Sequence, residues 1–302
     1  MAFDPNTRLT RENFGQLPLL CTDGAWGTEL IKLGGKPGEL KDLWNVTAPE
    51  KVLQVARSYI EAGAQVILTN TFSSNRISLE KHGAGGRAPE LSRAGAEISR
   101  RAAKGKAYVF ASIGPTGKMV SMGELSPEEA EDVFAEQAAA LAAGGADAIV
   151  VETQADLEEA RAALRGCLRA TSLPVGASFT FDSGKDKDRT MMGVTVAQVY
   201  EMAKETGASF VGANCGLGIE SYIPVAREFA ACGGGLPVWI KGNAGKPEVS
   251  SGGQTVYRAT PDVFAAAAGP LMEAGARFIG GCCGSTPAHI RALARALAAG
   301  DY

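Results

Sequence analysis

Residues 143–152 read AGGADAIVVE, and this stretch decides the fold. Two glycines end a helical pattern, since glycine readily adopts the left-handed conformation that closes a helix. An apolar run follows at once, which is typical of a strand buried on both faces of a parallel sheet. An acidic residue, Glu152, ends that run. The stretch therefore predicts a helix, a tight turn and a buried strand that ends in a carboxylate.

The same arrangement recurs in both directions along the chain. Residues 61–64, 205–208 and 273–276 each join the end of a helical pattern, through a glycine, to the start of an apolar run. Eight apolar runs alternate with amphipathic segments, at residues 17–22, 65–70, 107–112, 146–152, 174–180, 209–214, 237–242 and 277–281. This alternation favours parallel strands that are covered by helices.

Eight β/α units predict an α/β protein with a (β/α)8 TIM barrel. Because no Pro/Ser-rich linker divides the chain, residues 1–302 are expected to form one domain. A doubly wound open sheet is the alternative. That fold binds dinucleotides through a glycine fingerprint after the first strand, and residues 23–28 (DGAWGT) do not fit G-x-G-x-x-G. In a barrel, functional side chains are expected in the loops that follow the strands.

Several helix starts are marked by their chemistry. Residues 47–50 (TAPE) and 126–129 (SPEE) match the capping box, in which a Ser or Thr side chain and a Glu three residues later satisfy each other's backbone N–H groups. Pro261 and Pro287 each follow a threonine and are expected at the first helical position. Two longer insertions, 31–46 and 181–193, follow the first and fifth strands and are interpreted as lids or as surface decoration.

Composition excludes several classes of protein. The 302 residues carry 30 basic and 33 acidic side chains, for a net charge of −3, so the chain lacks the basic surface of a nucleic-acid binder or a polybasic membrane anchor. No run reaches the roughly 18–20 apolar residues of a membrane span, and the polar N-terminus does not resemble a signal peptide. We therefore expect a cytoplasmic protein without nucleic-acid or membrane partners. Its six cysteines are expected to be reduced, metal-bound or catalytic.

Three of the cysteines follow strands at the same end of the predicted barrel. Cys215 comes directly after the sixth strand, and Cys282 and Cys283 come directly after the eighth, with glycines on both sides. Three converging thiolates suit zinc, and a metal with three protein ligands keeps a fourth position for water or substrate. Small buried cysteines are the alternative, and this is the role expected for Cys21, Cys167 and Cys232.

Six motifs spread over nearly the whole chain resemble the zinc-dependent homocysteine S-methyltransferases. They are residues 23–30 (DGAWGTEL), 69–72 (TNTF), 111–117 (ASIGPTG), 152–153 (ET), 214–216 (NCG) and 280–284 (GGCCG). The resemblance is strongest to the homocysteine-binding domain of cobalamin-dependent methionine synthase. It implies a TIM barrel whose Zn²⁺ is held by Cys215, Cys282 and Cys283. It further implies that Asp23 and Glu152 hold the amino-acid part of the thiol substrate.

The residues themselves are compatible with that chemistry. Coordination to zinc deprotonates a thiol, and the resulting thiolate is the nucleophile that attacks a methyl group. Asp23 and Glu152 supply carboxylates for a substrate ammonium group, although acidic residues at such places also cap helices. Backbone N–H groups of residues 24–27, beginning with Gly24 and Ala25, suit the substrate carboxylate. Three further candidates are interpreted either as pocket groups or as turn formers: Asn70, Asn214 and Asn243.

Other residues allow other chemistry. Lys241, near the end of the seventh strand, is interpreted either as a Schiff-base lysine or, more commonly, as a surface or ion-paired one. The glycine-rich residues 280–285 are alternatively a phosphate site. After the seventh strand, homocysteine S-methyltransferases often carry proline–asparagine–alanine–glycine, whereas Gly242 stands here in place of the proline. Neither His82 nor His289 is expected to act in catalysis, and His289 is expected to face solvent.

We therefore predict a zinc-dependent enzyme that methylates a thiol, homocysteine, to a thioether, methionine. The donor is either a small sulfonium or ammonium compound or a methyl-corrinoid carried by a separate protein. The chain ends after the eighth unit, so no folate, cobalamin or reactivation module is expected within it, and the oligomeric state stays open. One alternative is an enzyme that demethylates another substrate with a corrinoid partner. Another is a non-catalytic zinc or thiol redox sensor, which needs a closed four-ligand site or a reversible disulfide.

Overall fold

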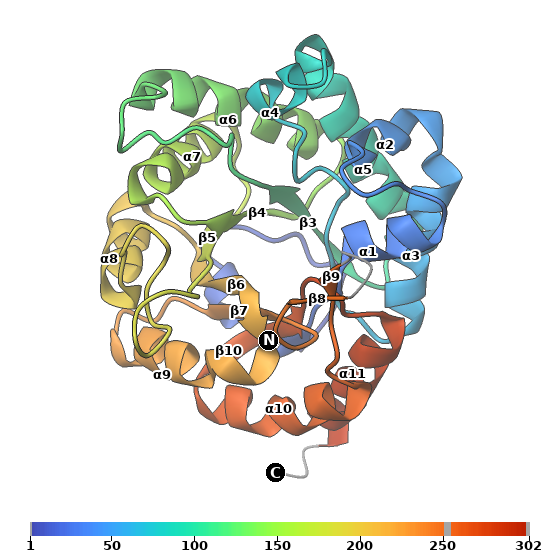
Figure 1. Cartoon of the computed structure of the whole chain (residues 1–302), viewed down its shortest axis with the longest axis vertical. Helices are drawn as coiled ribbons and strands as arrows, with labels where there is room; N and C mark the ends of the chain where they lie inside the picture. Colours follow the sequence, from blue (N-terminus) through green and yellow to red (C-terminus); the bar gives the residue numbers. More distant parts are fainter. Residues whose placement is uncertain (1, 251–254, 300–302) are drawn as a thin grey trace.

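The computed structural model describes residues 2–250 and 255–299, and its centre is a closed ring of parallel strands (Figure 1). Within the described residues this sheet has eight strands, in the order β1-β10-β7-β6-β5-β4-β3-β2. A parallel bridge between Thr22 and Val66 joins the two ends of that order and closes the ring. The predicted single-chain (β/α)8 TIM barrel is confirmed.

The barrel strands agree with the eight apolar runs. They are β1 (Leu20–Cys21), β2 (Val66–Ile67), β3 (Tyr108–Ile113), β4 (Ala148–Gln154), β5 (Val175–Phe179), β6 (Phe210–Gly218), β7 (Val238–Asn243) and β10 (Ala276–Gly281). One small hairpin was not predicted. It pairs β8 (Glu248–Val249) with β9 (Thr255–Val256) in antiparallel fashion, in the loop that follows β7.

Helices surround the barrel and connect successive strands (Figure 1). They are α1 (Trp26–Lys32), α2 (Trp44–Thr47), α3 (Pro49–Glu61), α4 (Arg76–Glu80), α5 (Ala88–Ala103), α6 (Pro127–Ala143), α7 (Leu157–Ala170), α8 (Val196–Thr206), α9 (Ile223–Ala231), α10 (Pro261–Glu273) and α11 (Pro287–Ala299). Four short 3-10 helices complete the described elements: η1 (Phe14–Gln16), η2 (Lys41–Leu43), η3 (Gly85–Arg87) and η4 (Ile219–Tyr222). Among the residues described, no helix is both long and apolar enough to cross a membrane.

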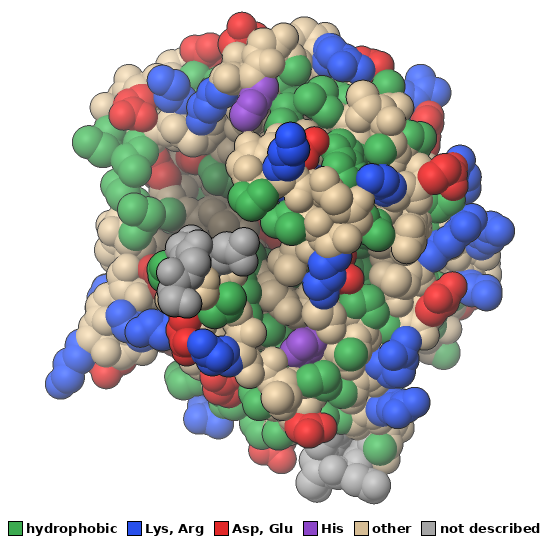
Figure 2. Space-filling model, turned by 45° about the vertical axis from the view of Figure 1, so that its right-hand side comes forward, with side chains coloured by type: hydrophobic (Ala, Val, Ile, Leu, Met, Phe, Trp, Pro, Cys, Tyr) green, Lys and Arg blue, Asp and Glu red, His purple; other side chains and the backbone are tan. Residues whose placement is uncertain are grey.

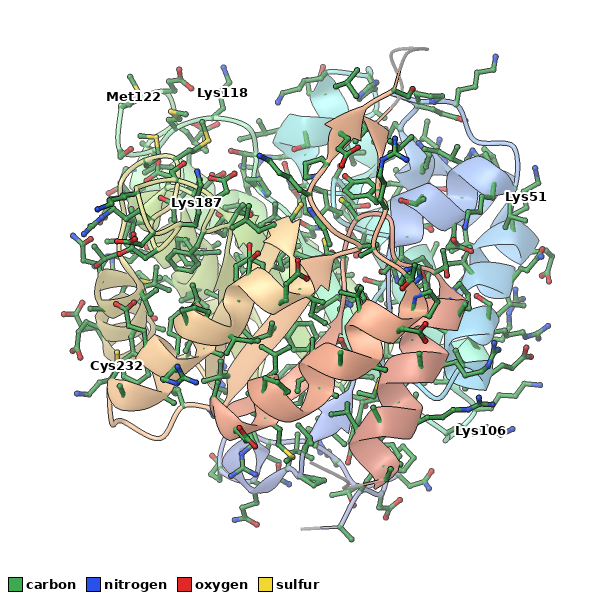
Figure 3. All side chains as sticks on the ribbon, turned by 60° about the horizontal axis from the view of Figure 1, so that its bottom comes forward. Lys51, Lys106, Lys118, Met122, Lys187 and Cys232 are labelled. Carbon is green, nitrogen blue, oxygen red and sulfur yellow. The ribbon has the colours of Figure 1, made fainter. Side chains whose placement is uncertain are left out.

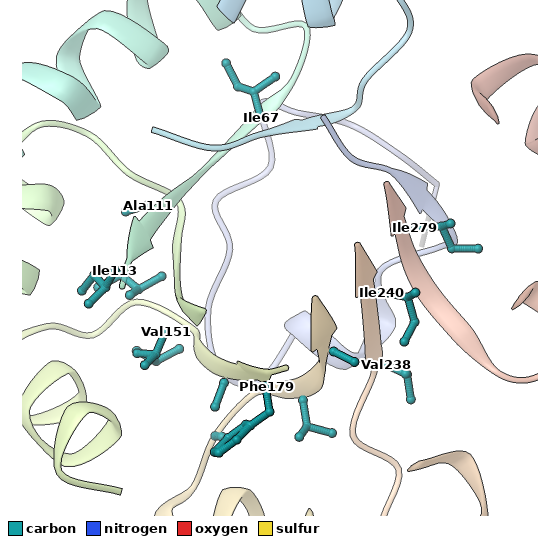
Figure 4. Close-up of a cluster of buried hydrophobic side chains, with 14 of the residues drawn as sticks. Ile67, Ala111, Ile113, Val151, Phe179, Val238, Ile240 and Ile279 are labelled. Carbon is teal, nitrogen blue, oxygen red and sulfur yellow. The ribbon is translucent and has the colours of Figure 1, made fainter. Parts of the chain in front are cut away.

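The strands bury both of their faces. Side chains such as Ile67, Val151 and Ile279 point away from the barrel axis and pack beneath the helices (Figure 4). Alternate residues point inward, because successive side chains of a strand lie on opposite faces. The inward side chains form a second core, in which Phe14 of η1 stacks on Phe210 and Phe278 at ring-centroid distances of 5.0 and 5.5 Å. The N-terminal segment thus fills one end of the barrel interior.

The helix starts agree with the sequence in part. The Ser126 side chain accepts a hydrogen bond from Glu129 N at 3.1 Å, and Pro261 and Pro287 begin α10 and α11 as predicted. The predicted cap at Thr47 is wrong. Thr47 lies in α2 and its hydroxyl donates to the Leu43 carbonyl, while α3 begins directly at a proline. A reciprocal capping box forms instead at the start of α8.

The polarity of the barrel fixes where its loops lie. Figure 3 labels Lys106, which precedes β3, at one end of the molecule and Lys118, which follows β3, at the other. The two insertions behave differently. Residues 38–42 of the first line the cavity described below. In the second, Ser183 N donates to the Arg189 carbonyl at 3.0 Å, so this segment folds back on itself.

Candidate functional site

A cavity of about 440 Å³ opens at the carboxyl ends of the barrel strands. It is lined by residues 24–28, 38–42, 68–70, 72–73, 82, 112, 152–153, 215, 241 and 281–283. These residues come from loops far apart in the sequence, and most follow directly after strands. The space-filling view shows a hollow in the surface with hydrophobic side chains at its edge (Figure 2). This is the end of a TIM barrel at which active sites are built.

Three sulfur atoms meet on one wall of this cavity. The Sγ atoms of Cys215, Cys282 and Cys283 all lie within 4.8 Å of one another, and Cys215 Sγ is 3.8 Å from Cys283 Sγ. All three residues are partly exposed, and all three line the cavity. Cys232, the residue at which α9 ends, does not line the cavity and lies on the outer helical layer (Figure 3). The convergence of β6 and β10 that the sequence predicts is thus present, and the sulfur atoms are close enough to share one ion.

The backbone at Cys215 is held in an unusual conformation. Its φ of 65° is left-handed, which a non-glycine residue adopts only when the surroundings impose it. The pairing of β6 with β7 shifts register between Asn214 and Gly218, and such irregularities turn side chains toward functional sites. Tyr222 fixes the turn, because its hydroxyl donates to the Cys215 carbonyl at 2.6 Å. The fold therefore directs this thiol into the cavity at a conformational cost.

The neighbouring strand holds the second pair of thiols. Cys282 N donates to the Gly242 carbonyl at 2.7 Å, which ties the end of β10 to β7. A Cβ at position 242 would lie 2.2 Å from the Ile219 Cα, so only glycine fits against η4. This close approach is the physical reason for glycine at position 242.

In the absence of a cation the three thiols favour their protonated forms. At Cys215 the hydrogen bond with Cys282 lowers the pKa, but the hydrogen bond with Cys283 and burial raise it, to about 12 overall. The hydrogen bond with Cys215 raises the pKa of Cys282 well above its ordinary value. At Cys283 the hydrogen bond with Cys215 lowers the pKa and the one with Cys282 raises it, again to about 12 overall. Three thiolates at this spacing repel one another, and a divalent cation is the charge that offsets the repulsion.

Glu152 lines the same cavity. Its side chain accepts a hydrogen bond from the Ser112 hydroxyl, and the residue is only 6% exposed. Burial raises the pKa of Glu152, while the Ser112 hydrogen bond and the charge of Lys241 lower it. The following residue, Thr153, also has a left-handed φ, of 61°.

Asn214 links β6 to the end of β4, and it stands next to two residues with a left-handed backbone, Thr153 and Cys215. Its Oδ1 accepts from Thr153 N at 2.9 Å, and its Nδ2 donates to Thr153 Oγ1 at 2.7 Å. Its Oδ1 also accepts from Ser178 at 2.7 Å. Because these bonds occupy the amide, and because Asn214 is fully buried and not part of the cavity lining, it supports the site from behind.

Asp23 is brought close to the site but not into the cavity. Its carboxylate is ion-paired with Lys241, and it accepts further hydrogen bonds from Trp26 Nε1 and Leu68 N, both at 2.7 Å. The side chain is completely buried and does not line the cavity, whereas Lys241 does. Lys241 is thus an ion-paired lysine rather than a free amine, and it is buried rather than on the surface.

The remaining sequence candidates have mixed positions. Gly24 and Ala25 line the cavity, but Ala25 N already donates to Ser285 Oγ at 3.1 Å. Asn70 also lines it, and its Nδ2 donates to the Lys41 carbonyl and to Asn45. Asn243 is not brought into the cavity; it is buried, and its Oδ1 has no hydrogen-bond partner.

Sequence reasoning missed three residues of the site and misplaced another. Tyr257, after β9, hydrogen-bonds with Cys283 and packs its ring against Gly284. Asp42 and His82 line the cavity. No strand-end signal marks these three, because they come from insertions and loop ends. His289 does not face solvent: it is buried, and its Nε2 lies 2.9 Å from the Ala259 carbonyl.

Comparisons with known proteins agree with this geometry. The sequence model of the homocysteine S-methyltransferase family matches residues 20–297. The methionine synthases of Mycobacterium tuberculosis and Mycobacterium leprae are 34% and 32% identical over 298 residues, which cover 93% of this chain. This chain spans only about a quarter of the length of those relatives, 25% and 24%.

Solved structures show the same fold. The metallated form of the homocysteine methyltransferase MmuM from Escherichia coli has a TM-score of 0.75 at 23% identity, over 94% of this chain and 98% of that one. A methyltransferase from Methanosarcina mazei has a TM-score of 0.66 at 12% identity, over 98% and 99%. With the family model covering most of the sequence, the conclusion is direct: the chain belongs to the homocysteine S-methyltransferase family.

Proposed function

We propose that the protein is a zinc-dependent methyltransferase that converts homocysteine to methionine. Membership of the homocysteine S-methyltransferase family supports an S-methyltransferase that acts on homocysteine. The single observation that carries the zinc requirement is the cluster of three cysteine sulfur atoms on the cavity wall. Soft thiolate donors suit zinc, and a three-ligand site that faces a cavity leaves room for a substrate atom.

The donor set fits the metal. Cys215, Cys282 and Cys283 would hold the zinc ion, which when bound would lower the pKa of an incoming thiol and so favour its nucleophilic form. Because these thiols must lose their protons to act as ligands, zinc binding would release protons and its affinity would fall at low pH. The cavity then encloses the acceptor, with its sulfur end at the cysteine wall.

The other residues of the cavity orient the acceptor. Glu152, which lines the cavity, would accept hydrogen bonds from the acceptor's ammonium group. Gly24 and the turn that follows it supply backbone groups for the carboxylate, except for Ala25, whose N–H is already used. Asn70 lines the cavity on the side of β2. These contacts hold both ends of an amino acid while leaving the mouth free for the methyl donor.

The donor is tested by direct assay. Zinc-loaded protein is incubated with homocysteine and, separately, with a small sulfonium, a quaternary ammonium or a methyl-corrinoid, and methionine is measured. We expect methionine from one of these donors and none from the Cys283→Ser variant. A protein that forms no methionine from any donor, but removes a methyl group from another compound with a corrinoid acceptor, would instead be the demethylating enzyme considered above.

A further inference from the structure

A separate cavity of about 720 Å³ opens at the amino ends of the first two strands. It lies between the end of α3 and the last turns of α11, beside residues that precede β1 and β2. It shares no lining residue with the cavity that holds the cysteines. Its volume falls within the range of small-molecule sites, about 300–1,000 Å³. The proposed reaction gives this amino-end cavity no role.

Much of the wall of the amino-end cavity is apolar. Pro18 and Leu19 precede β1, Cys21 lies within β1, and all three line the cavity. Leu297 lines it from α11. The small side chains of α11 and of the end of α3 leave the space open: Ala62, Gly63, Ala294 and Ala298. Such a wall suits a hydrocarbon or aromatic body.

Two arginines line the same cavity. Arg291 and Arg295 are both exposed, and residues four apart lie on the same face of a helix. Within residues 2–250 and 255–299, neither arginine has an ion-pair or hydrogen-bond partner. By contrast, Arg161 on α7 is paired with Glu205 at 2.9 Å. The amino-end cavity thus has two guanidinium groups whose donors are available to a ligand.

Gln65 and Glu61 complete the polar lining. The Gln65 amide oxygen accepts a hydrogen bond from Cys21 N at 3.2 Å, while its NH2 group has no partner among the described residues. Glu61 sets one negative charge against the two positive charges, so the lining has a net charge of about +1. Guanidinium groups bind carboxylates, sulfonates and phosphates through charge-assisted hydrogen bonds. The charge of the cavity therefore favours an anion.

We propose that the amino-end cavity is a binding site for an organic anion with an apolar body. The acidic group of this ligand contacts Arg291 and Arg295, and its body packs on the apolar wall that includes Leu19 and Leu297. The inference does not depend on the proposed function. Because the two cavities share no residue, the ligand is not a reactant in the methyl transfer.

The test uses two fluorescent probes that differ in charge. Anilinonaphthalene sulfonate has an aromatic body and an anionic sulfonate, and phenylnaphthylamine is the same body without the sulfonate. Fluorescence titration of the zinc-loaded protein gives a dissociation constant for each probe. Inorganic phosphate is added in a separate titration as a competitor that has the charge but no apolar body.

Two variants test where the probes bind. Arg291→Gln/Arg295→Gln removes both charges, and Arg227→Gln, an exposed arginine on α9 that lines neither cavity, is its control. Ala298→Trp fills the amino-end cavity from an exposed position. Ala299→Trp, on the same helix but outside the lining, is its control. Circular dichroism checks that each variant is folded.

We expect the sulfonate probe to bind wild type more tightly than the neutral probe does. The double arginine variant should lose about tenfold in affinity for the sulfonate probe, the effect of one charge-assisted hydrogen bond, and keep its affinity for the neutral probe. Ala298→Trp should weaken the binding of both probes. The two controls should bind both probes as wild type does, and inorganic phosphate should not displace the sulfonate probe.

Three results overturn the inference. Equal affinity of wild type and the double arginine variant for the sulfonate probe would mean that the arginines hold no acidic group. Unchanged binding of both probes to Ala298→Trp would place them elsewhere in the molecule, and this result decides the question even where the arginine variant fails to fold. Displacement by inorganic phosphate would mean that the site takes a bare anion. Methionine formation is not part of the readout, so failure of the proposed function leaves this test unaffected.

Discussion

At the scale of single residues, the sulfur cluster could be predicted from the sequence because the cysteines lie at or directly after the carboxyl ends of β6 and β10. Strand ends of a barrel converge, so Cys215 and Cys282 could be placed together although 67 positions separate them. The burial of Asp23 was not accessible in the same way. Its pairing with Lys241 depends on which inward side chains meet across the barrel, and no local pattern encodes that.

The cysteines give the first prediction. Replacement of Cys215, Cys282 or Cys283 by serine removes a soft ligand, and we expect zinc affinity to fall by more than about a hundredfold, the upper range for loss of an outer-shell partner. Metal content after dialysis and the absorption of the cobalt-substituted protein measure this. Cys232→Ser, on the outer layer, is the matched control and keeps its metal. A cluster variant that retained full zinc content would show that its cysteine is not a ligand.

Asp42 gives a pH prediction. Burial raises the pKa of Asp42 from 3.8 to about 6, against hydrogen bonds from Ser74 and Ser73 that lower it. The folded protein therefore retains this proton at pH values where the unfolded chain has lost it. The contribution of Asp42 to the free energy of unfolding consequently falls as pH rises from about 4 to about 6. Above about pH 6 this contribution does not change further.

The substitution Asp42→Asn removes the charge and keeps an oxygen that accepts the same hydrogen bonds. We expect it to raise the free energy of unfolding at pH 8 by up to about 3 kcal/mol, which corresponds to a shift of about two pKa units. The gain disappears near pH 4, where the wild-type carboxyl is protonated. Urea denaturation at the two pH values measures both. An equal effect at both would mean that the substitution acts through packing instead of charge.

At the scale of elements, the eight strands could be predicted because each is a continuous apolar run bounded by turn residues. The hairpin of β8 and β9 was missed because its strands are two residues long and exposed. The cap at Thr47 failed for a different reason. The motif was present, but α2 extends through Thr47, so Ala48 stands at the N-cap position of α3 and has no side-chain oxygen to cap it.

The contact between β7 and η4 gives a prediction at this scale. In the Gly242→Ala variant the added methyl group would lie 2.2 Å from the Ile219 Cα, so the two elements must separate. We expect a loss of about 1–3 kcal/mol of stability, as for an overpacked core, together with weaker zinc binding, because Gly242 also accepts the Cys282 N–H. Gly86→Ala, where a Cβ meets nothing within 4 Å, is the control and is expected to behave as wild type in both measurements.

At the scale of the whole molecule, the barrel has two unlike ends. One end holds the cavity, and Phe14 closes the other by stacking on aromatic side chains from β6 and β10. The N-terminal segment is thus a structural part of the barrel, a role that its mostly polar sequence does not reveal. Because the two ends are separate, we expect a substitution at the aromatic end to change the free energy of unfolding without changing ligand affinity at the cavity.

Phe14→Ala is the prediction for the whole fold. Removing this buried ring leaves a void beside the three rings that it contacts, Phe110, Phe210 and Phe278, and we expect a loss of about 3–5 kcal/mol in the free energy of unfolding. Because the cavity lies at the opposite end, the folded variant should bind homocysteine with wild-type affinity. Urea denaturation and calorimetric titration measure the two quantities. A large loss of affinity in the folded variant would contradict the independence of the two ends.

The aromatic side chains that close one end of the barrel also restrict the order in which ligands enter and leave the cavity. The barrel interior is packed with side chains and closes the cavity on that side, so whatever occupies the deepest position must arrive first and depart last. For the reaction proposed here, the amino-acid thiol enters before the methyl donor covers the opening, and the thioether leaves only after the spent donor has withdrawn. Steady-state kinetics should accordingly show a compulsory order of substrate binding. The donor is not expected to bind productively until the thiol occupies the cavity.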